Sequence, residues 1–229
     1  MAPLPSPPVT GTGTVALIGG GEFTPACTID RRLLERAATD RVLVLPTAAA
    51  YEHPQRLVAA AATWFDDLGA RAEGLDVLAR PDALSPENIE AVRTSRFTYL
   101  VGGSPMHLRS VLKDTPMWDA IVESVDAGGV VAGSSAGAMV LTDPMVDPRG
   151  GAFTLGLGLV SGLAVIPAAD QWSHDRLHRT LELSHGFLVA ALRWGSALVH
   201  AGDGTWSAHG DVTVHDGAAE VSLERLPRR

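Results

Sequence analysis

Short apolar runs alternate along the chain with segments in which apolar residues recur every three or four positions. The runs at 14–19 (TVALIG), 41–45 (RVLVL) and 97–101 (FTYLV) lack polar alternation, which is typical of strands covered on both faces of a sheet. Strands alternating with helices predict a parallel sheet with helices on both faces. We therefore expect a mostly parallel, doubly wound α/β fold with strands at 14–19, 41–45, 97–101 and 129–132 and helices at 29–38, 54–68 and 117–125.

The C-terminal part of the chain has a different pattern. Residues 198–223 are short stretches separated by glycine-containing turns, which predicts antiparallel strands at a sheet edge. The chain has no internal repeat and no linker, so residues 13–229 are predicted to form one domain. Residues 1–12 are rich in proline and are predicted to be a flexible tail.

Three glycine-rich corners follow predicted strands, at 19–21, 102–103 and 133–137. In open α/β sheets a ligand binds outside the carboxyl ends of the strands. We therefore expect the three corners to converge in space and to form the functional site.

The third corner, Gly133-Ser134-Ser135-Ala136-Gly137, matches G-x-S-x-G between a strand and a helix, the context that a nucleophile elbow requires. In that interpretation Ser135 is the nucleophile, and the amide of Ala136 points at a developing oxyanion. The alternative is a tight turn in which small residues serve packing alone.

The first corner raises a competing hypothesis, a dinucleotide-binding loop. That fingerprint needs G-x-G-x-x-G or G-x-G-x-x-A opening a helix, whereas the third glycine position here holds Thr24, followed by Pro25. No suitably placed acidic residue ends a second strand. The sequence therefore predicts no nicotinamide or flavin cofactor.

Composition narrows the choice of partners. The net charge is −8 without a basic stripe, so neither nucleic acid nor a membrane surface is an expected partner. The single cysteine, Cys27, excludes a disulfide within the chain and a zinc site of several thiolates. Residues 1–13 lack the features of a secretory signal, and the apolar stretch 156–169 is too short to cross a membrane. We expect a cytoplasmic protein that binds a small molecule or a short peptide-like ligand, and a homodimer is the assembly that we consider.

Several motifs together resemble one family. The segments GGGEFTP (19–25), LPTAAA (45–50), VGGSPMHL (101–108), AGSSAGA (132–138) and DPRGGAFTLGLGL (147–159) are similar to the S51 serine peptidases, which include dipeptidase E and cyanophycinase within the class I glutamine amidotransferase-like superfamily. The chain particularly resembles actinobacterial "type 1 glutamine amidotransferase-like" proteins. The resemblance implies a three-layer α/β/α sandwich, Ser135 as nucleophile, and an oxyanion hole formed by Ala136, Gly102 and Gly103.

The sequence departs from the family at the partners of the serine. The family places its histidine after a strand, in contexts resembling P-H-Y-D, whereas this chain reads Pro167-Ala168-Ala169-Asp170. The family's orienting glutamate lies in a segment resembling E-x-T-A-L, whose match here begins at Trp194. Ala168 and Trp194 therefore stand at the two remaining triad positions. A serine hydroxyl needs an adjacent, oriented base, so an ordinary S51 peptidase is not expected.

Other histidines could replace the missing base. His174, His178 and His185 are predicted to share one helix face, with Ser173 as N-cap and Gly186 as C-terminal stop. His174 could reach the pocket as a relocated base, and His107 follows the second glycine corner. For both histidines we favour the alternative interpretation, an ordinary position on a helix face. The pair His174 and His178 lacks an evident third ligand, so no metal site is predicted.

The remaining pocket residues allow two interpretations each. Asp170 could orient a base or contact a substrate amine, or it could cap the following helix. Trp194, with Trp172 nearby in the pattern, could create an aromatic cleft for a flat ligand, an apolar ligand or a cation, or it could fill the space of the lost pair. The full set of candidate pocket residues is Gly20, Gly21, Ser104, His107, Ser134, Asp170, Trp172, His174 and Trp194.

Three functions remain open at this point. In the first, the chain is a repurposed enzyme that keeps the nucleophile corner and acts on a small metabolite or on an amide- or peptide-like substrate. In the second, it is an active serine hydrolase with a relocated base. In the third, it is an inactive binding protein. We favour the first, because a binding protein has no need of the intact corner and an ordinary peptidase does not tolerate the loss of both partners.

Overall fold

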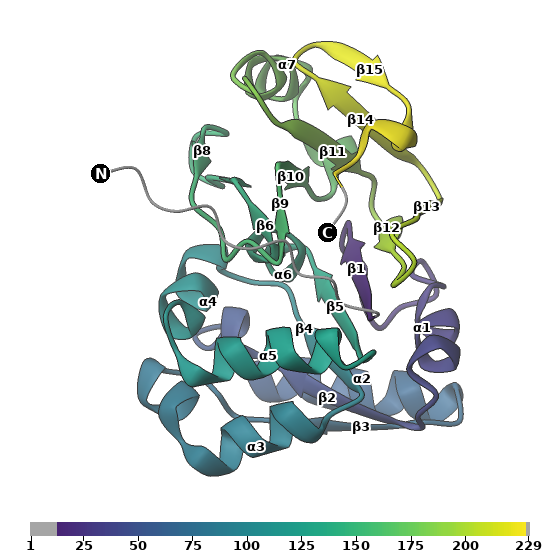
Figure 1. The fold of residues 1–229 in the computed structure, drawn as a ribbon, viewed down its shortest axis with the longest axis vertical. Helices are drawn as coiled ribbons and strands as arrows, with labels where there is room; N and C mark the ends of the chain where they lie inside the picture. Colours follow the sequence, from purple (N-terminus) through teal and green to yellow (C-terminus); the bar gives the residue numbers. More distant parts are fainter. Residues whose placement is uncertain (1–12, 228–229) are drawn as a thin grey trace.

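The computed structural model describes residues 13–227 and contains two main sheets (Figure 1). The predicted tail, residues 1–12, lies outside the described residues. The larger sheet has seven strands in the order β13-β12-β1-β5-β4-β2-β3, and the five from β1 to β3 are parallel. Their bounds are β1 Thr14–Ile18, β2 Arg41–Leu45, β3 Arg71–Gly74, β4 Phe97–Leu100, β5 Val130–Ser134, β12 Ala197–His200 and β13 Trp206–His209.

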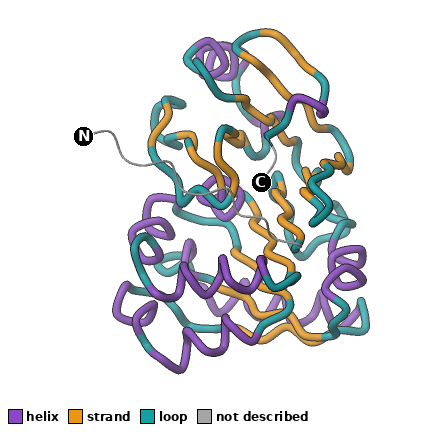
Figure 2. Tube along the Cα trace, viewed as in Figure 1, coloured by secondary structure: helices purple, strands orange, loops and turns teal. Residues whose placement is uncertain are grey.

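Helices cover both faces of this sheet, which confirms the predicted α/β fold. Alternate residues of β1 enter different cores: Val15 and Leu17 face one, and Ala16 and Ile18 face the other. Helices α3 to α6 contribute to the first core and α1 and α2 to the second, so the strands are buried on both sides (Figure 2). The helices are α1 Asp30–Ala37, α2 Pro54–Asp67, α3 Pro86–Thr94, α4 Pro105–Leu112, α5 Pro116–Asp126, α6 Ala136–Leu141 and α7 His174–Glu182.

A second sheet lies beyond the carboxyl ends of β1 and β5 (Figure 1). The sequence interpretation expected one sheet, so this sheet is a correction to it. Its strand order is β15-β14-β11-β10-β6-β9, and β10 and β11 form its parallel centre. The bounds are β6 Thr142–Asp143, β9 Val160–Ser161, β10 Leu163–Ile166, β11 Leu188–Leu192, β14 Val212–Asp216 and β15 Ala219–Val221; β7 Met145–Val146 pairs separately with β8 Phe153–Thr154.

The predicted antiparallel C-terminal strands are confirmed, and they are divided between the two sheets. β12 and β13 extend the first sheet beside β1. β14 and β15 extend the second sheet beside β11. The chain after residue 196 therefore crosses between the sheets and ties them together at the end where the glycine corners lie.

Helix α7 differs from its prediction at the C-terminal end. Ser173 is its N-cap, as expected, and accepts a hydrogen bond from the Arg176 amide. The helix ends at Glu182, with Leu183 as C-cap. His185 and Gly186 lie beyond it, so the three histidines do not share one helix face and Gly186 is not the stop. Across residues 13–227, the helices are all too short or too polar to span a bilayer.

Candidate active site

Ser135 lies between β5 and α6 in a strained conformation. Its φ and ψ are 50° and −108°, which a non-glycine residue adopts only at a cost of about 1–3 kcal/mol. Its amide donates to the carbonyl of Ile18 at the end of β1. This sharp turn leaves Ser135 half-buried while Ser134 before it and all of α6 after it are buried. The geometry is that of a nucleophile elbow.

The two glycines of the corner are required by close backbone contact. A Cβ on Gly133 would lie 2.5 Å from the carbonyl carbon of Gly137, and a Cβ on Gly137 would lie 2.3 Å from the carbonyl oxygen of Leu100. The start of α6 thus packs directly against β4 and against its own entering strand. The serine is fixed by main-chain packing rather than by its own side chain.

Glu22 joins all three glycine corners, and the sequence interpretation did not select it. Its Oε1 accepts from the Gly102 amide at 2.9 Å, and its Oε2 accepts from Ser134 Oγ at 2.7 Å. A Cβ on Gly102 would lie 2.8 Å from Glu22 Oε1 and 3.3 Å from Ser135 Cβ. The predicted convergence of the corners is therefore confirmed. The available signal was the position of Glu22 directly after the first glycine run.

The three residues assigned to the oxyanion hole, Gly102, Gly103 and Ala136, differ in their surroundings. The Gly102 amide donates to Glu22, so within this structure its hydrogen bond is already used. Gly103 is exposed with φ 136°, and a Cβ there would lie 2.3 Å from the Ala48 carbonyl oxygen. The Ala136 amide belongs to the first residue of α6, next to Ser135. The assignment of Ala136, Gly102 and Gly103 to an oxyanion hole stays a prediction.

Ala168 and Trp194 both border the first glycine corner. The Ala168 amide donates to the Gly19 carbonyl at 2.8 Å, and the Gly195 amide donates to the Gly20 carbonyl at 3.1 Å. The same loop follows Ile18, whose carbonyl binds the Ser135 amide. The two positions that the family resemblance assigns to a histidine and a glutamate are thus gathered beside the serine corner, although no imidazole or carboxylate stands at either.

Trp194 lies across two glycines. A Cβ on Gly20 would lie 3.0 Å from two atoms of its six-membered ring, and a Cβ on Gly21 would lie 2.8 Å from its Nε1. Both glycines have positive φ, 115° and 75°. The loop covers one side of the indole, and Trp194 is still 49% exposed.

The other candidate residues have structural partners. Asp170 Oδ1 accepts from the Trp194 amide at 2.8 Å, so it caps no helix and instead ties residues 168–170 to the loop after β11. Ser104 is the N-cap of α4 and accepts from the His107 amide. Trp172 packs against Arg176, whose guanidinium carbon is 3.6 Å from the ring centroid. Trp172 and Trp194 therefore have separate partners, the side chain of Arg176 in one case and the first glycine corner in the other.

The two candidate replacement bases, His174 and His107, make their contacts with residues other than Ser135. The side chain of His174 is 93% exposed and stacks on His178, on a helix at the far end of the second sheet from β5 (Figure 1). His107 Nε2 is 2.8 Å from the Leu78 carbonyl and its ring packs against Tyr51. The other histidines lie elsewhere: His53, His178 and His185 are exposed, His200 packs on Trp206, His209 contacts Arg32, and His215 contacts Thr213.

A buried polar group underlies the first corner. Asp30 is fully buried at the start of α1 and accepts from Trp64 Nε1 at 2.8 Å. Burial raises the pKa of Asp30 to about 7, because the charged carboxylate loses its hydration. Burial also raises the pKa values of the Cys27 thiol and the Tyr99 hydroxyl nearby. The Cys27 thiol and the Tyr99 hydroxyl are therefore neutral at pH 7, whereas Asp30 titrates near pH 7.

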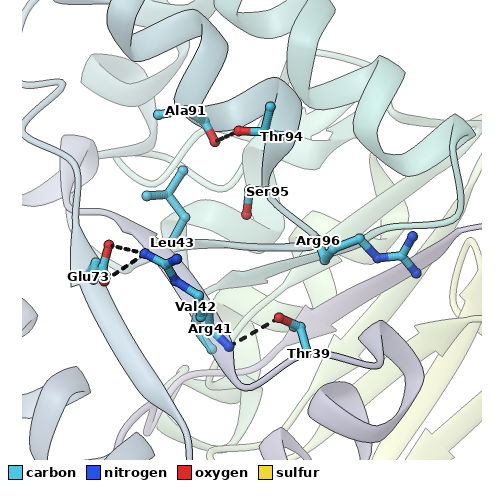
Figure 3. A pocket seen from close by; sticks show the side chains of 9 residues that line it. All are labelled: Thr39, Arg41, Val42, Leu43, Glu73, Ala91, Thr94, Ser95 and Arg96. Atoms are coloured by element: carbon cyan, nitrogen blue, oxygen red, sulfur yellow. Dashed lines mark hydrogen bonds and ion pairs between the residues drawn. The ribbon is translucent and has the colours of Figure 1, made fainter.

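Two cavities lie away from the serine. One, of about 370 Å³, lies at the amino ends of β2 and β4, opposite to the glycine corners (Figure 3). Arg41 and Glu73 form an ion pair at 3.0 Å along its wall. The other cavity, of about 530 Å³, lies between α7 and the second sheet, and Asp170 and Arg193 form part of its rim. Within residues 13–227, no three histidine, cysteine or acidic side chains gather closely enough to hold a metal ion.

Comparison with known proteins agrees with this geometry. The model of peptidase family S51 matches residues 15–206. Cyanophycinases of Trichormus variabilis and Geminocystis herdmanii are each 28% identical to the chain, over 75% and 71% of its length. The matches cover 60% and 63% of those relatives, so the chain spans less than two thirds of their length.

Two solved structures have the same fold. A peptidase from an acI-B1 Actinobacterium superposes with a TM-score of 0.81 at 31% identity, covering 93% of this chain and 95% of that one. A putative peptidase E protein from Listeria monocytogenes EGD-e superposes with a TM-score of 0.61 at 17% identity, covering 92% and 99%. The second likeness shows the fold alone.

Proposed function

Because this chain belongs to peptidase family S51, we propose that it is a diverged member that acts on a small amide- or peptide-like metabolite at Ser135 without the usual triad. Ser135 is the nucleophile in this proposal. Positions 168 and 194, which would carry the histidine and the glutamate, hold alanine and tryptophan.

One observation carries the proposal. Ser135 keeps a strained elbow conformation, although Ala168 and Trp194 beside the adjacent glycine loop supply no base. Strain of this kind persists only where the surrounding structure maintains it. A corner that served packing alone could relax by exchanging Ser135 for glycine. The retained strain therefore supports continued use of the hydroxyl or of the space in front of it.

An active dipeptidase with a relocated base is the second candidate function. The side chain of His174 faces solvent, and the ring of His107 is hydrogen-bonded to the Leu78 carbonyl. Both observations weigh against these residues as the base, because a general base must reach the proton that it removes. A binding protein without catalysis is the third candidate. It is separated from the first by whether Ser135 reacts at all once a base is supplied.

The test uses a fluorophosphonate probe, which labels serines that are activated by a neighbouring base. We expect negligible labelling of Ser135 in the unmodified protein at neutral pH. Ala168→His alone should give little labelling, because an unoriented imidazole is a poor base. Ala168→His combined with Trp194→Glu should increase the labelling rate by more than the two single changes together, since such a pair acts as a unit. Ser135→Ala in the same background is the matched control.

Two outcomes would contradict the proposal. Rapid labelling of the unmodified protein that disappears in Ser135→Ala would establish a working base and support the active hydrolase. Absence of labelling in a folded double variant would mean that positions 168 and 194 do not serve Ser135, and the binding protein would then be the better interpretation. Circular dichroism and thermal melting of the double variant confirm that it is folded.

A further inference from the structure

Two tryptophans near the site differ in what covers their rings. Trp172 is half-buried and already has a cation on its ring, the guanidinium of Arg176 at 3.6 Å, which also donates to the Pro148 carbonyl. Trp194 has a glycine loop on one side and is 49% exposed. Among residues 13–227, no arginine or lysine lies over the ring of Trp194.

Two carboxylates belong to segments that contact Trp194. Asp170 Oδ1 accepts from the Trp194 amide, and within the described part of the chain its Oδ2 makes no hydrogen bond. Glu22 directly follows Gly21, on which the indole lies. The neighbouring cation, Arg193, is paired with Asp211 at 3.1 Å. An exposed indole face attracts organic cations, because the ring quadrupole presents its negative side to them, and, within residues 13–227, the free Oδ2 of Asp170 on the neighbouring segment is the available carboxylate oxygen.

We propose that the exposed face of Trp194 binds a small alkylammonium group, with the cation over the indole and beside Asp170. An ammonium fits better than a guanidinium, because a guanidinium is best held by both oxygens of one carboxylate. Asp170 offers one remaining oxygen, and both oxygens of Glu22 are already hydrogen-bonded. An uncharged apolar ligand would gain nothing from either carboxylate.

This inference names a ligand class for the site proposed above, and it depends on that proposal only for its connection with Ser135. The loop under the indole continues from Ile18, whose carbonyl binds the Ser135 amide. The proposal places the ammonium of the ligand over Trp194 and the remainder of the ligand toward the serine corner. Trp194 becomes a specificity-determining residue at the position where the resemblance expects a glutamate.

The experiment compares choline with 3,3-dimethylbutan-1-ol, its uncharged isostere. Binding is followed by the indole Nε1–H resonances of ¹⁵N-tryptophan-labelled protein, which contains five tryptophans. Trp194→Phe identifies the resonance of Trp194. We expect choline to shift this resonance at millimolar concentrations, and the isostere to bind roughly three- to thirtyfold more weakly, as a cation–π contact predicts. The Trp172 resonance is the internal control and should not move, because Arg176 occupies its ring.

Variants separate the contributions of ring and charge. Trp194→Leu, observed by the chemical shifts of choline itself, should abolish the preference for choline over the isostere, and Trp194→Phe should retain part of it. Asp170→Asn should weaken choline binding severalfold and leave isostere binding unchanged. If either variant fails to fold, the comparison of the two ligands on the unmodified protein still decides the question.

The outcomes that overturn the inference are distinct from those for the reaction. Equal binding of choline and the isostere, movement of the Trp172 resonance together with that of Trp194, or no shift at about 100 mM choline, which would fill a millimolar site, each rule out the cation site. Ser135→Ala should bind choline as the unmodified protein does. Choline binding to the unmodified protein, together with no labelling of the folded variant that carries Ala168→His and Trp194→Glu, would support the cation site and refute the reaction at Ser135.

Discussion

The serine side of this site and the side that we propose once held the base differ in how tightly their residues are packed. The serine side is built by the first sheet, through β1, β4, β5 and α6, and its close main-chain contacts are all in place. In our proposal the base side is formed by residues 168–170 and 193–195 at the ends of β10 and β11 in the second sheet, where alanine and tryptophan stand at positions 168 and 194. Substitution on the serine side disturbs the core itself, whereas the exposed and half-buried positions on the base side can change at little cost to folding.

The largest expected effect concerns hydrolysis of aspartyl dipeptides. A serine enzyme that loses its base typically loses on the order of 10⁶ in turnover and keeps roughly 10³–10⁴ over the uncatalysed rate. We expect this protein to be near that floor. A discontinuous chromatographic assay of dipeptide cleavage, with Ser135→Ala as the control, measures it.

One result would contradict this prediction. Turnover at an ordinary enzymatic rate, roughly 1–10³ per second, would mean that the base side is complete. Loss of that turnover in His174→Ala or in His107→Ala would identify the replacement base and would require the corresponding side chain to move from its present contacts.

A smaller but still large effect is expected for folding stability on the serine side. Gly137→Ala places a Cβ 2.3 Å from the Leu100 carbonyl oxygen, a main-chain atom that can move only with β4. We expect a loss of about 3 kcal/mol or more and a melting temperature lower by roughly 6–12 °C. Gly150→Ala is the matched control, because a Cβ at Gly150 meets no atom within 4 Å. Equal melting temperatures for the two variants would show that the corner is not fixed by packing.

The smallest expected effect has the opposite sign and lies on the base side. Ala168 has a left-handed backbone, with φ 47° and ψ 44°, a conformation that glycine adopts without the steric cost of a Cβ. We expect Ala168→Gly to raise stability by about 0–1 kcal/mol and the melting temperature by up to about 3 °C. Ala38→Gly, at an exposed C-cap with φ 49° and ψ 47°, should behave in the same way. A clear loss of stability at residue 168 alone would mean that the Ala168 methyl group packs in the site.

Four parallel strands of the first sheet were predictable from the sequence, and the reason is local; β3, with one buried residue, was not predicted. The strands β1, β2, β4 and β5 are continuous apolar runs. The helices α1, α2 and α5 between them have the apolar period of a packed helix, so each of these elements is recognisable by itself. In the second sheet, β10 and β11 are buried apolar runs of the same kind, which the sequence interpretation did not assign to a separate sheet. The strands β6 and β9 have two residues each and acquire their geometry from pairing partners distant in the sequence. Such partners leave no periodic pattern.

The candidate site shows the same division. Ser135 and its glycines form a continuous motif, so their place at the strand ends could be predicted. Glu22 could not, because its role depends on two acceptor contacts, to Gly102 and Ser134, that exist only after three distant corners meet. The position of Trp194 on Gly20 and Gly21 likewise depends on the approach of β11 to β1.

The complete burial of α6 has a consequence for motion. All six of its residues are buried, so the hydrogen-bonded amides of its last turn, such as that of Met139, which donates to the Ser135 carbonyl, should exchange with solvent only when most of the protein opens. The serine therefore stands on one of the slowest-exchanging parts of the chain. Any adjustment to an incoming ligand must come from the segments around residues 168–172 and 194, whose amides should exchange through local fluctuations, so that the two halves of one site would open on different timescales.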